Sequence, residues 1–231
     1  MMAAGDATER PVIGVLGGTG NEGSALALRW AHAGFRVIIG SRNLDKAAQV
    51  CAQINAQIGR EGTTPQTNRG AAEAASVLVM TVPYSAQRST VEDVRDLLAG
   101  KILVDTTVPL VPPKVARVQL PEGGSAVAAI QQLLGESVKV VSAFQNVSAH
   151  ALQDLGHEVE CDVLVCGDDV QARETVIGLA TDIGLRALHA GPIVNSAGAE
   201  ALTSLLISIN SRYKVAQGAG IRITGLDRPK S

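Results

Sequence analysis

A glycine-rich segment near the start of the chain has the spacing of a phosphate-binding loop. Gly18, Gly20 and Gly23 satisfy G-x-G-x-x-G within VIGVLGGTGNEGSALALRW, which runs from Val12 to Trp30. An apolar run typical of a strand precedes the motif and a helix pattern follows it, as the motif requires. Glycines allow backbone N–H groups to approach a pyrophosphate, and a helix N-terminus favours negative charge. We therefore expect a dinucleotide here; the alternative is a strand-to-helix turn that is merely rich in glycine.

The end of the second predicted strand indicates which dinucleotide binds. An acidic residue at this place would bind the ribose 2′-hydroxyl of NAD. The sequence instead reads IIGSRNLDK, with Ser41 and Arg42 at the tip and Lys46 one helical turn later. A hydroxyl, a guanidinium fork and an ammonium suit a 2′-phosphate, and Thr19 can add a second hydroxyl. We expect NADP; the alternative is that Arg42 and Lys46 belong to a solvated loop and helix start.

Two further strand ends carry proline-marked turns, MTVPYS and VDTTVPL. In an open parallel sheet such ends face the cofactor crevice. Val82, Pro83 and Tyr84 are therefore expected along the middle and the nicotinamide half of the cofactor. The second turn is expected to line its other side with Thr107, Val108 and Pro109. Taken singly, each proline could equally well mark an ordinary end of a strand before a loop, with no role at the cofactor.

The elements that position these residues alternate along the chain. The pattern predicts strands at 11–17, 35–41, 77–83, 101–108, 138–144, 161–167 and 185–191. It predicts helices at 22–34, 44–59, 89–100, 127–134, 170–184 and 199–217, a short helix after residue 68, a polar loop between 59 and 68 and an exposed excursion at 109–125. Apolar strands separated by helices indicate an α/β fold with a doubly wound parallel sheet covered on both faces.

Composition excludes several classes of protein. The chain has 231 residues, 46% of them hydrophobic and 18% charged, and a net charge of −2, which gives no reason to expect nucleic-acid or membrane binding. Residues 1–11 lack the apolar centre of a signal peptide and are expected to form a flexible leader. Three cysteines without a C-x-x-C pair and four scattered histidines indicate reduced thiols, a cytoplasmic location and no metal site. The apolar final helix, ALTSLLISI, favours a homodimer or a larger homo-oligomer.

No catalytic acid or base accompanies the expected cofactor site. Short-chain dehydrogenases need Tyr-x-x-x-Lys, but Tyr84 is followed four residues later by Arg88, and the lysine after Tyr213 is directly adjacent. A β-hydroxyacid dehydrogenase needs a lysine on its first long C-terminal helix. Here the last predicted helix has no lysine before Lys214, near its end. Both classes are disfavoured.

The chain resembles the NADPH-dependent reductases of the deazaflavin coenzyme F-420 from Val12 to about Gly220. The segments that carry this resemblance are GVLGGTGNEGSALALRWAHAGFRVIIGSRNLDKA, TVPY, VVSAFQNVSA, VLVCGDD and AGPIVNS. The first segment is shared in part by other Rossmann reductases, whereas the joint occurrence of the other four is more specific. The resemblance implies a Rossmann NADP-binding domain at 12–145 and a small C-terminal α/β-plus-helix domain at 146–231 that closes the deazaflavin cleft.

The resemblance also implies roles for individual residues. NADP would be contacted by Thr19, Gly20, Asn21, Glu22, Ser41, Arg42, Lys46, Tyr84, Val108 and Ala149. The deazaflavin would be met by Thr203, and further candidates on its side are Gln145, Asn146 and Gly198. Gln145 stands where family members commonly have His, and Ala201 where some have Ser. Hydride would pass directly between nicotinamide C4 and deazaflavin C5, so no catalytic side chain is expected.

Two other functions stay open at this point. One is an NADPH-dependent reductase of another acceptor, such as a flavin or an imine. The other is a redox sensor that binds NADP without transferring hydride. This alternative stays open because the segment GGTGNEG is similar to the nucleotide-binding loop of such regulators. Only small-molecule partners are expected in each case.

Overall fold

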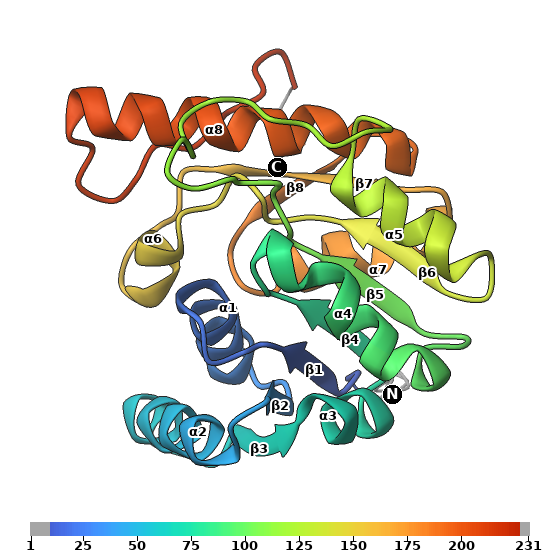
Figure 1. Ribbon diagram of the computed structural model, residues 1–231. Coiled ribbons are helices and arrows are strands. Elements are labelled where there is room, and N and C mark those ends of the chain that lie inside the picture. Colours follow the sequence, from blue (N-terminus) through green and yellow to red (C-terminus); the bar gives the residue numbers. More distant parts are fainter. Residues whose placement is uncertain (1–9, 227–231) are drawn as a thin grey trace, which may run out of the picture.

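The computed structural model describes residues 10–226, which form one sheet with helices on both faces (Figure 1). The strand order is β3-β2-β1-β4-β5-β6-β7-β8. The strands are β1 (Ile13–Leu16), β2 (Val37–Ser41), β3 (Thr63–Thr67), β4 (Val77–Met80), β5 (Ile102–Asp105), β6 (Lys139–Ser142), β7 (Asp162–Gly167) and β8 (Arg186–His189). All neighbouring pairs are parallel except β6 and β7. The predicted doubly wound fold is confirmed, with one antiparallel pair added.

The helices cover the sheet in two layers. They are α1 (Asn21–His32), α2 (Leu44–Ile58), α3 (Asn68–Ala74), α4 (Tyr84–Val94), α5 (Ala126–Leu134), α6 (Ala149–Gln153), α7 (Val170–Thr181) and α8 (Ser196–Tyr213). Buried side chains of α1, α2, α6 and α7 form one apolar cluster with the strands, and those of α3, α4 and α5 form another. The burial of both faces explains why the central strands read as continuous apolar runs.

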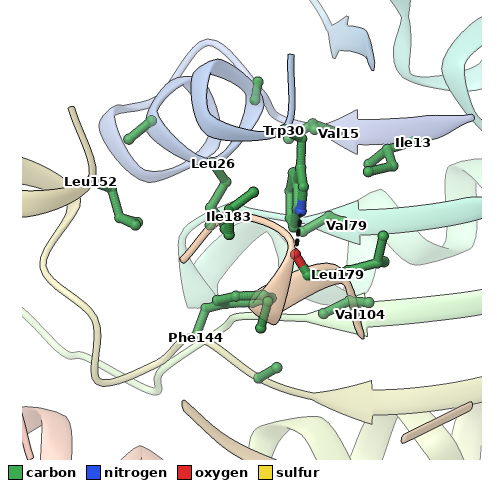
Figure 2. Close-up of a cluster of buried hydrophobic side chains, with 14 of the residues drawn as sticks. Ile13, Val15, Leu26, Trp30, Val79, Val104, Phe144, Leu152, Leu179 and Ile183 are labelled. Carbon is green, nitrogen blue, oxygen red and sulfur yellow. Dashed lines mark hydrogen bonds between the residues drawn. The ribbon is translucent and has the colours of Figure 1, made fainter. Parts of the chain in front are cut away.

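The larger cluster joins the two halves of the chain around Trp30 (Figure 2). Its indole Nε1 donates a hydrogen bond of 2.9 Å to the carbonyl of Leu179 on α7. Its ring meets Phe144 edge to face, with centroids 5.7 Å apart and planes at 86°. A buried indole N–H needs such a partner, and this one lies on an element far along the sequence. Trp30 therefore fixes α1 against α7.

The segment after residue 145 continues the same sheet and the same core. Val141 pairs with Gly167 and Ser142 with Cys166. Buried Arg29 of α1 donates to the carbonyls of Leu152, Ala151, Asp154 and His157, which immobilises α6 and the loop behind it. A division into domains at residue 145 stays a prediction, and the predicted leader lies outside the described residues except for Arg10 and Pro11.

Several boundaries differ from the predicted ones. Residues 63–67 form the edge strand β3 instead of a polar loop. The sequence does not reveal this strand, because it is mostly exposed, pairs only with β2 and contains Pro65. The Asn55 side chain holds it in place through hydrogen bonds to Gly62 and Thr63. Helix α4 begins at Tyr84 and not at residue 89, and α8 spans 196–213 instead of 199–217. Helix α6 has no counterpart among the predicted helices.

The segment 109–125 contains no helix or strand, as predicted, and connects β5 to α5. In Figure 1 it passes as a long green loop near α8. Among the helices of residues 10–226, none combines the length and the apolar character needed to cross a bilayer.

Candidate functional site

Two adjoining cavities open at the carboxyl ends of the parallel strands. A basic cavity of about 560 Å³ contains the cationic side chains at the end of β2. An apolar cavity of about 670 Å³ lies beside it, below the 109–125 loop. Both are lined by Gly20, Thr81, Val82 and Pro83, so they form one continuous groove. A groove at the switch point of a doubly wound sheet is where such folds bind dinucleotides.

The glycine loop lies at the junction of the cavities. A Cβ on Gly23 would come within 2.4 Å of Thr81 Oγ1 and 2.8 Å of Gly18 Cα, so this position is needed for close packing of α1. A Cβ on Gly20 would find no atom closer than 3.7 Å, which leaves its backbone open to the groove. Gly20 also precedes the first turn of α1 without a side-chain cap. The free N–H groups of that turn suit an anion.

The basic cavity brings together the residues predicted for a 2′-phosphate. Thr19, Ser41, Arg42 and Lys46 all line it. Arg42 and Lys46 are exposed, and neither forms an ion pair with another residue in the described part of the chain. Asn43 caps α2 by accepting a hydrogen bond from the Lys46 backbone N–H at 3.0 Å, which fixes both cations around the same turn. A phosphate would supply the anion that both cations lack.

The apolar cavity collects residues from six parts of the fold. Val82, Pro83 and Tyr84 enter from the start of α4, and Val108 from the end of β5. Further residues come from the 109–125 loop, the end of β6 and α8, namely Leu110, Val111, Pro112, Val115, Gln145, Val147 and Thr203. The glycine loop contributes Gly20, Asn21 and Glu22. Most of this surface is hydrocarbon, as expected for a site that holds flat aromatic rings.

Gln145 lines this cavity and carries a buried acceptor. The residue is 6% exposed, and its Nε2 donates to the carbonyl of Asp105 at 2.9 Å and to Ser142 Oγ at 2.8 Å. Its Oε1 has no hydrogen-bond partner within the described residues. A buried polar atom without a partner is costly, so a ligand donor at this place would satisfy it.

Asn146 and Thr203 use their polar atoms within the protein. Asn146 Nδ2 donates to the Ala199 carbonyl at 2.8 Å and to Thr203 Oγ1 at 3.1 Å. The Thr203 hydroxyl in turn bonds to the Gln145 carbonyl at 2.9 Å. These bonds join the end of β6 to α8. Thr203 lines the apolar cavity and Asn146 does not.

Two more predicted residues lie outside both cavities. Ala149 is the first residue of α6 and does not line the groove. Gly198 is exposed on α8, and a Cβ added there would meet no atom within 4 Å. The position of Gly198 therefore does not support its predicted place beside the deazaflavin. Gly18 and Gly23 belong to the loop but lie behind the groove surface.

Two acidic residues, Glu22 and Asp105, lie close together at the apolar cavity, and the charge of one affects the ionisation of the other. The sequence gives no sign that these two carboxyl groups interact. Half-buried Glu22 lines the cavity, and burial raises the pKa of its carboxyl to about 8, with the Asp105 carboxylate adding to the increase and Thr106 opposing it. Asp105 is fully buried at the end of β5 and accepts hydrogen bonds from Thr107 N at 2.9 Å and Gln87 Nε2 at 2.7 Å. Burial raises the pKa of Asp105 as well.

Residues 10–226 contain no group of three or more histidine, cysteine, aspartate or glutamate side chains that could hold a metal ion. Cys51, Cys161 and Cys166 are buried and free, and burial raises the pKa of each thiol. Thiols of this kind are poor nucleophiles.

Known proteins match this chain over almost its whole length. The family model described as NADP oxidoreductase coenzyme F420-dependent matches residues 12–109. The F420-dependent NADP reductases of Methanocaldococcus jannaschii and Methanothermobacter thermautotrophicus are each 41% identical, over 93% of this chain and 99% and 95% of their own lengths. A solved structure from Arthrobacter sp. FB24, provisionally assigned as an F420-dependent NADP reductase, superposes with a TM-score of 0.75 at 26% identity, covering 90% of this chain and 97% of its own. The chain belongs to the family of F420-dependent NADP reductases.

Proposed function

We propose that this protein is an oxidoreductase that transfers a hydride between NADP(H) and coenzyme F420. The observation that carries the proposal is the continuous groove, in which a cationic end passes through a glycine loop into an apolar end. These three parts match the phosphate, pyrophosphate and ring portions of NADP in order. The relatives that match the chain at 41% identity are named for the same pair of substrates.

The basic end of the groove holds the 2′-phosphate in this proposal. Arg42 supplies a guanidinium fork, Lys46 a second positive charge, and Ser41 and Thr19 hydroxyls. The uncapped first turn of α1 binds the pyrophosphate through its backbone N–H groups. A ribose 2′-hydroxyl without phosphate would leave both cations unpaired, so NADPH is preferred over NADH.

The apolar cavity receives the nicotinamide and the deazaflavin. When both are bound, they supply the chemistry, a hydride passing from one ring carbon to the other. The protein positions the rings and excludes water: Val82, Pro83 and Val108 provide apolar walls, and Gln145 Oε1 accepts a hydrogen bond from a ring donor. No side chain needs to act as acid or base in the hydride step itself.

The test is a spectrophotometric assay with purified protein, NADPH and oxidised coenzyme F420, following the loss of the deazaflavin absorbance. We expect turnover with NADPH that is much faster than with NADH. Tight NADPH binding without F420 reduction, but with reduction of a flavin or an imine, would replace the acceptor. Binding without turnover of any acceptor would identify a sensor and refute the proposed activity.

Three wider properties stay proposals. We propose a small C-terminal region that closes over the deazaflavin, a cytoplasmic location, and self-association. Self-association is supported by α8, on which Leu205, Ile209 and Tyr213 are 50%, 40% and 74% exposed. Apolar groups gathered on one helix in this way are typical of contact surfaces.

A further inference from the structure

The carboxyl of Glu22 distinguishes this groove from a purely apolar ring site. Glu22 lies in the first turn of α1, one residue before Gly23, and lines the apolar cavity with Thr81, Val82 and Tyr84. In the proposed placement, the cationic cavity and the glycine loop hold the phosphates, so the nicotinamide must lie in the adjoining cavity. Glu22 belongs to the turn that binds the pyrophosphate, but it also lines this adjoining cavity and so lies toward the nicotinamide. The nicotinamide is the part of NADP that changes charge, since the oxidised ring carries a positive charge and the reduced ring carries none.

We propose that Glu22 is a protonation-dependent selector between the two redox forms of the cofactor: as a neutral acid it tolerates both, and as a carboxylate it favours the oxidised, cationic ring. The inference rests on the proposed placement of NADP in the groove. It concerns equilibrium binding and adds no covalent step to the reaction.

The surroundings of Glu22 keep the carboxyl neutral at ordinary pH. The acidic group beneath it, Asp105, is 0% exposed and cannot be screened by solvent. Glu200 of α8 is also buried, and burial raises the pKa of its carboxyl, with Asp105 adding to the increase. The other titratable side chain that lines the apolar cavity is Tyr84 of α4. None of these groups supplies a positive charge to stabilise ionised Glu22.

The direction of the pH effect follows from these neighbours. The pKa of Glu22 is raised to about 8, so the group is neutral at pH 6.5 and ionised at pH 9.5. Ionisation places a negative charge beside the nicotinamide, which attracts the oxidised ring and leaves the reduced ring unpaired. An opposite charge within about 4–6 Å shifts a carboxyl pKa by about 1–3 units, and by linkage the binding of that charge changes by roughly 10- to 1000-fold. The ratio of the NADPH and NADP⁺ dissociation constants should therefore increase with pH.

The experiment measures both dissociation constants at pH 6.5, 8.0 and 9.5, by NADPH fluorescence and by competition with NADP⁺. Taking the ratio cancels the phosphate contacts that both forms share. We expect the ratio for the unaltered protein to rise at least about tenfold between the extremes. The midpoint of the rise should lie below 8, because the cationic ring lowers the pKa of Glu22 in the NADP⁺ complex. The Glu22→Gln variant is neutral at every pH and nearly the same shape, so its ratio should stay constant.

Each other result counts against the inference. A constant ratio in the unaltered protein overturns it, and so does an equal rise in Glu22→Gln, which would assign the effect to another group. Tyr84→Phe serves as the second variant, because it removes the other titratable side chain of the cavity and should keep the rise. Failure to bind NADPH at all three pH values would overturn the proposed placement of the cofactor, and with it the inference.

Discussion

Replacement of Arg42 by alanine tests the assignment of the basic cavity most directly. The guanidinium is exposed and forms no ion pair with the rest of the described chain, so its removal leaves no buried group without a partner. The free energy of unfolding should therefore change by less than about 0.5 kcal/mol. Any large effect on ligand binding can then be attributed to the lost contact.

The expected loss can be estimated from the chemistry of the contact. A hydrogen bond to a charged group contributes about 1.5–3 kcal/mol, and each 1.4 kcal/mol is a factor of ten in affinity. The Arg42→Ala variant should thus bind NADPH roughly 10- to 150-fold more weakly, with the lower end expected because the site is open to water. NADH has no 2′-phosphate, so its affinity should change by less than about twofold. Higher ionic strength should reduce the difference.

The assay is a fluorescence titration of both reduced cofactors against each variant. Arg36→Ala is the matched control, because Arg36 is also exposed but precedes β2 at the opposite end of the strand. Arg42→Asp should extend the loss for NADPH by adding repulsion. Equal losses for NADPH and NADH, or no loss for NADPH, would refute the reasoning that places the 2′-phosphate in the basic cavity.

Two further predictions concern α8. Glu200 accepts hydrogen bonds from Ser125 Oγ at 2.6 Å, Ala126 N at 2.8 Å and Val127 N at 3.2 Å, so it anchors α8 to the start of α5. Each buried donor left without an acceptor costs about 1–3 kcal/mol. Glu200→Ala should therefore lower the free energy of unfolding, measured by chemical denaturation, by at least about 2 kcal/mol. The control Glu174→Ala removes an exposed carboxylate and should leave the free energy of unfolding nearly unchanged. A Cβ added at Gly198 or at Gly178 of α7 would meet no atom within 4 Å. Gly198→Ala should therefore raise the free energy of unfolding by about 0.5–1 kcal/mol without changing the KM for F420, and the control Gly178→Ala should have the same two effects. A KM that increases in Gly198→Ala alone would show that this residue contacts the deazaflavin after all.

Local patterns were enough to predict the nucleotide-binding half of the fold. The strands β1 and β2 are buried on both faces and therefore apolar throughout, and the glycine motif lies at a fixed place between strand and helix. Ser41, Arg42 and Lys46 could be predicted to lie near the 2′-phosphate because the end of β2 lies at a fixed place beside the glycine motif. The edge strand β3 could not be predicted, since its residues are mostly exposed and carry no apolar pattern.

The predictions for the acceptor side depended on the resemblance. Of its four candidates, Gln145 and Thr203 line the apolar cavity, whereas Asn146 and Gly198 do not. Whether a residue reaches the groove there depends on how α8 lies across the end of β6. One hydrogen bond between side chains and two from side chains to backbone carbonyls fix this arrangement. Spacing along the sequence does not contain that information, because the contacts join segments that are distant in the chain.

The behaviour of Glu22 shows why a charge inside a motif cannot be interpreted from the motif alone. At the first turn of a helix an acidic residue is normally favoured as a carboxylate, since the macrodipole stabilises negative charge there. In this fold β5 ends directly beside that turn and places Asp105 against the same space; within residues 10–226 Asp105 has no cationic partner. Desolvation and repulsion then outweigh the dipole, and the pKa moves to about 8 instead of below 4.5. The sign of the shift is set by a strand order that brings β5 within reach of α1, and that order follows from the fold as a whole.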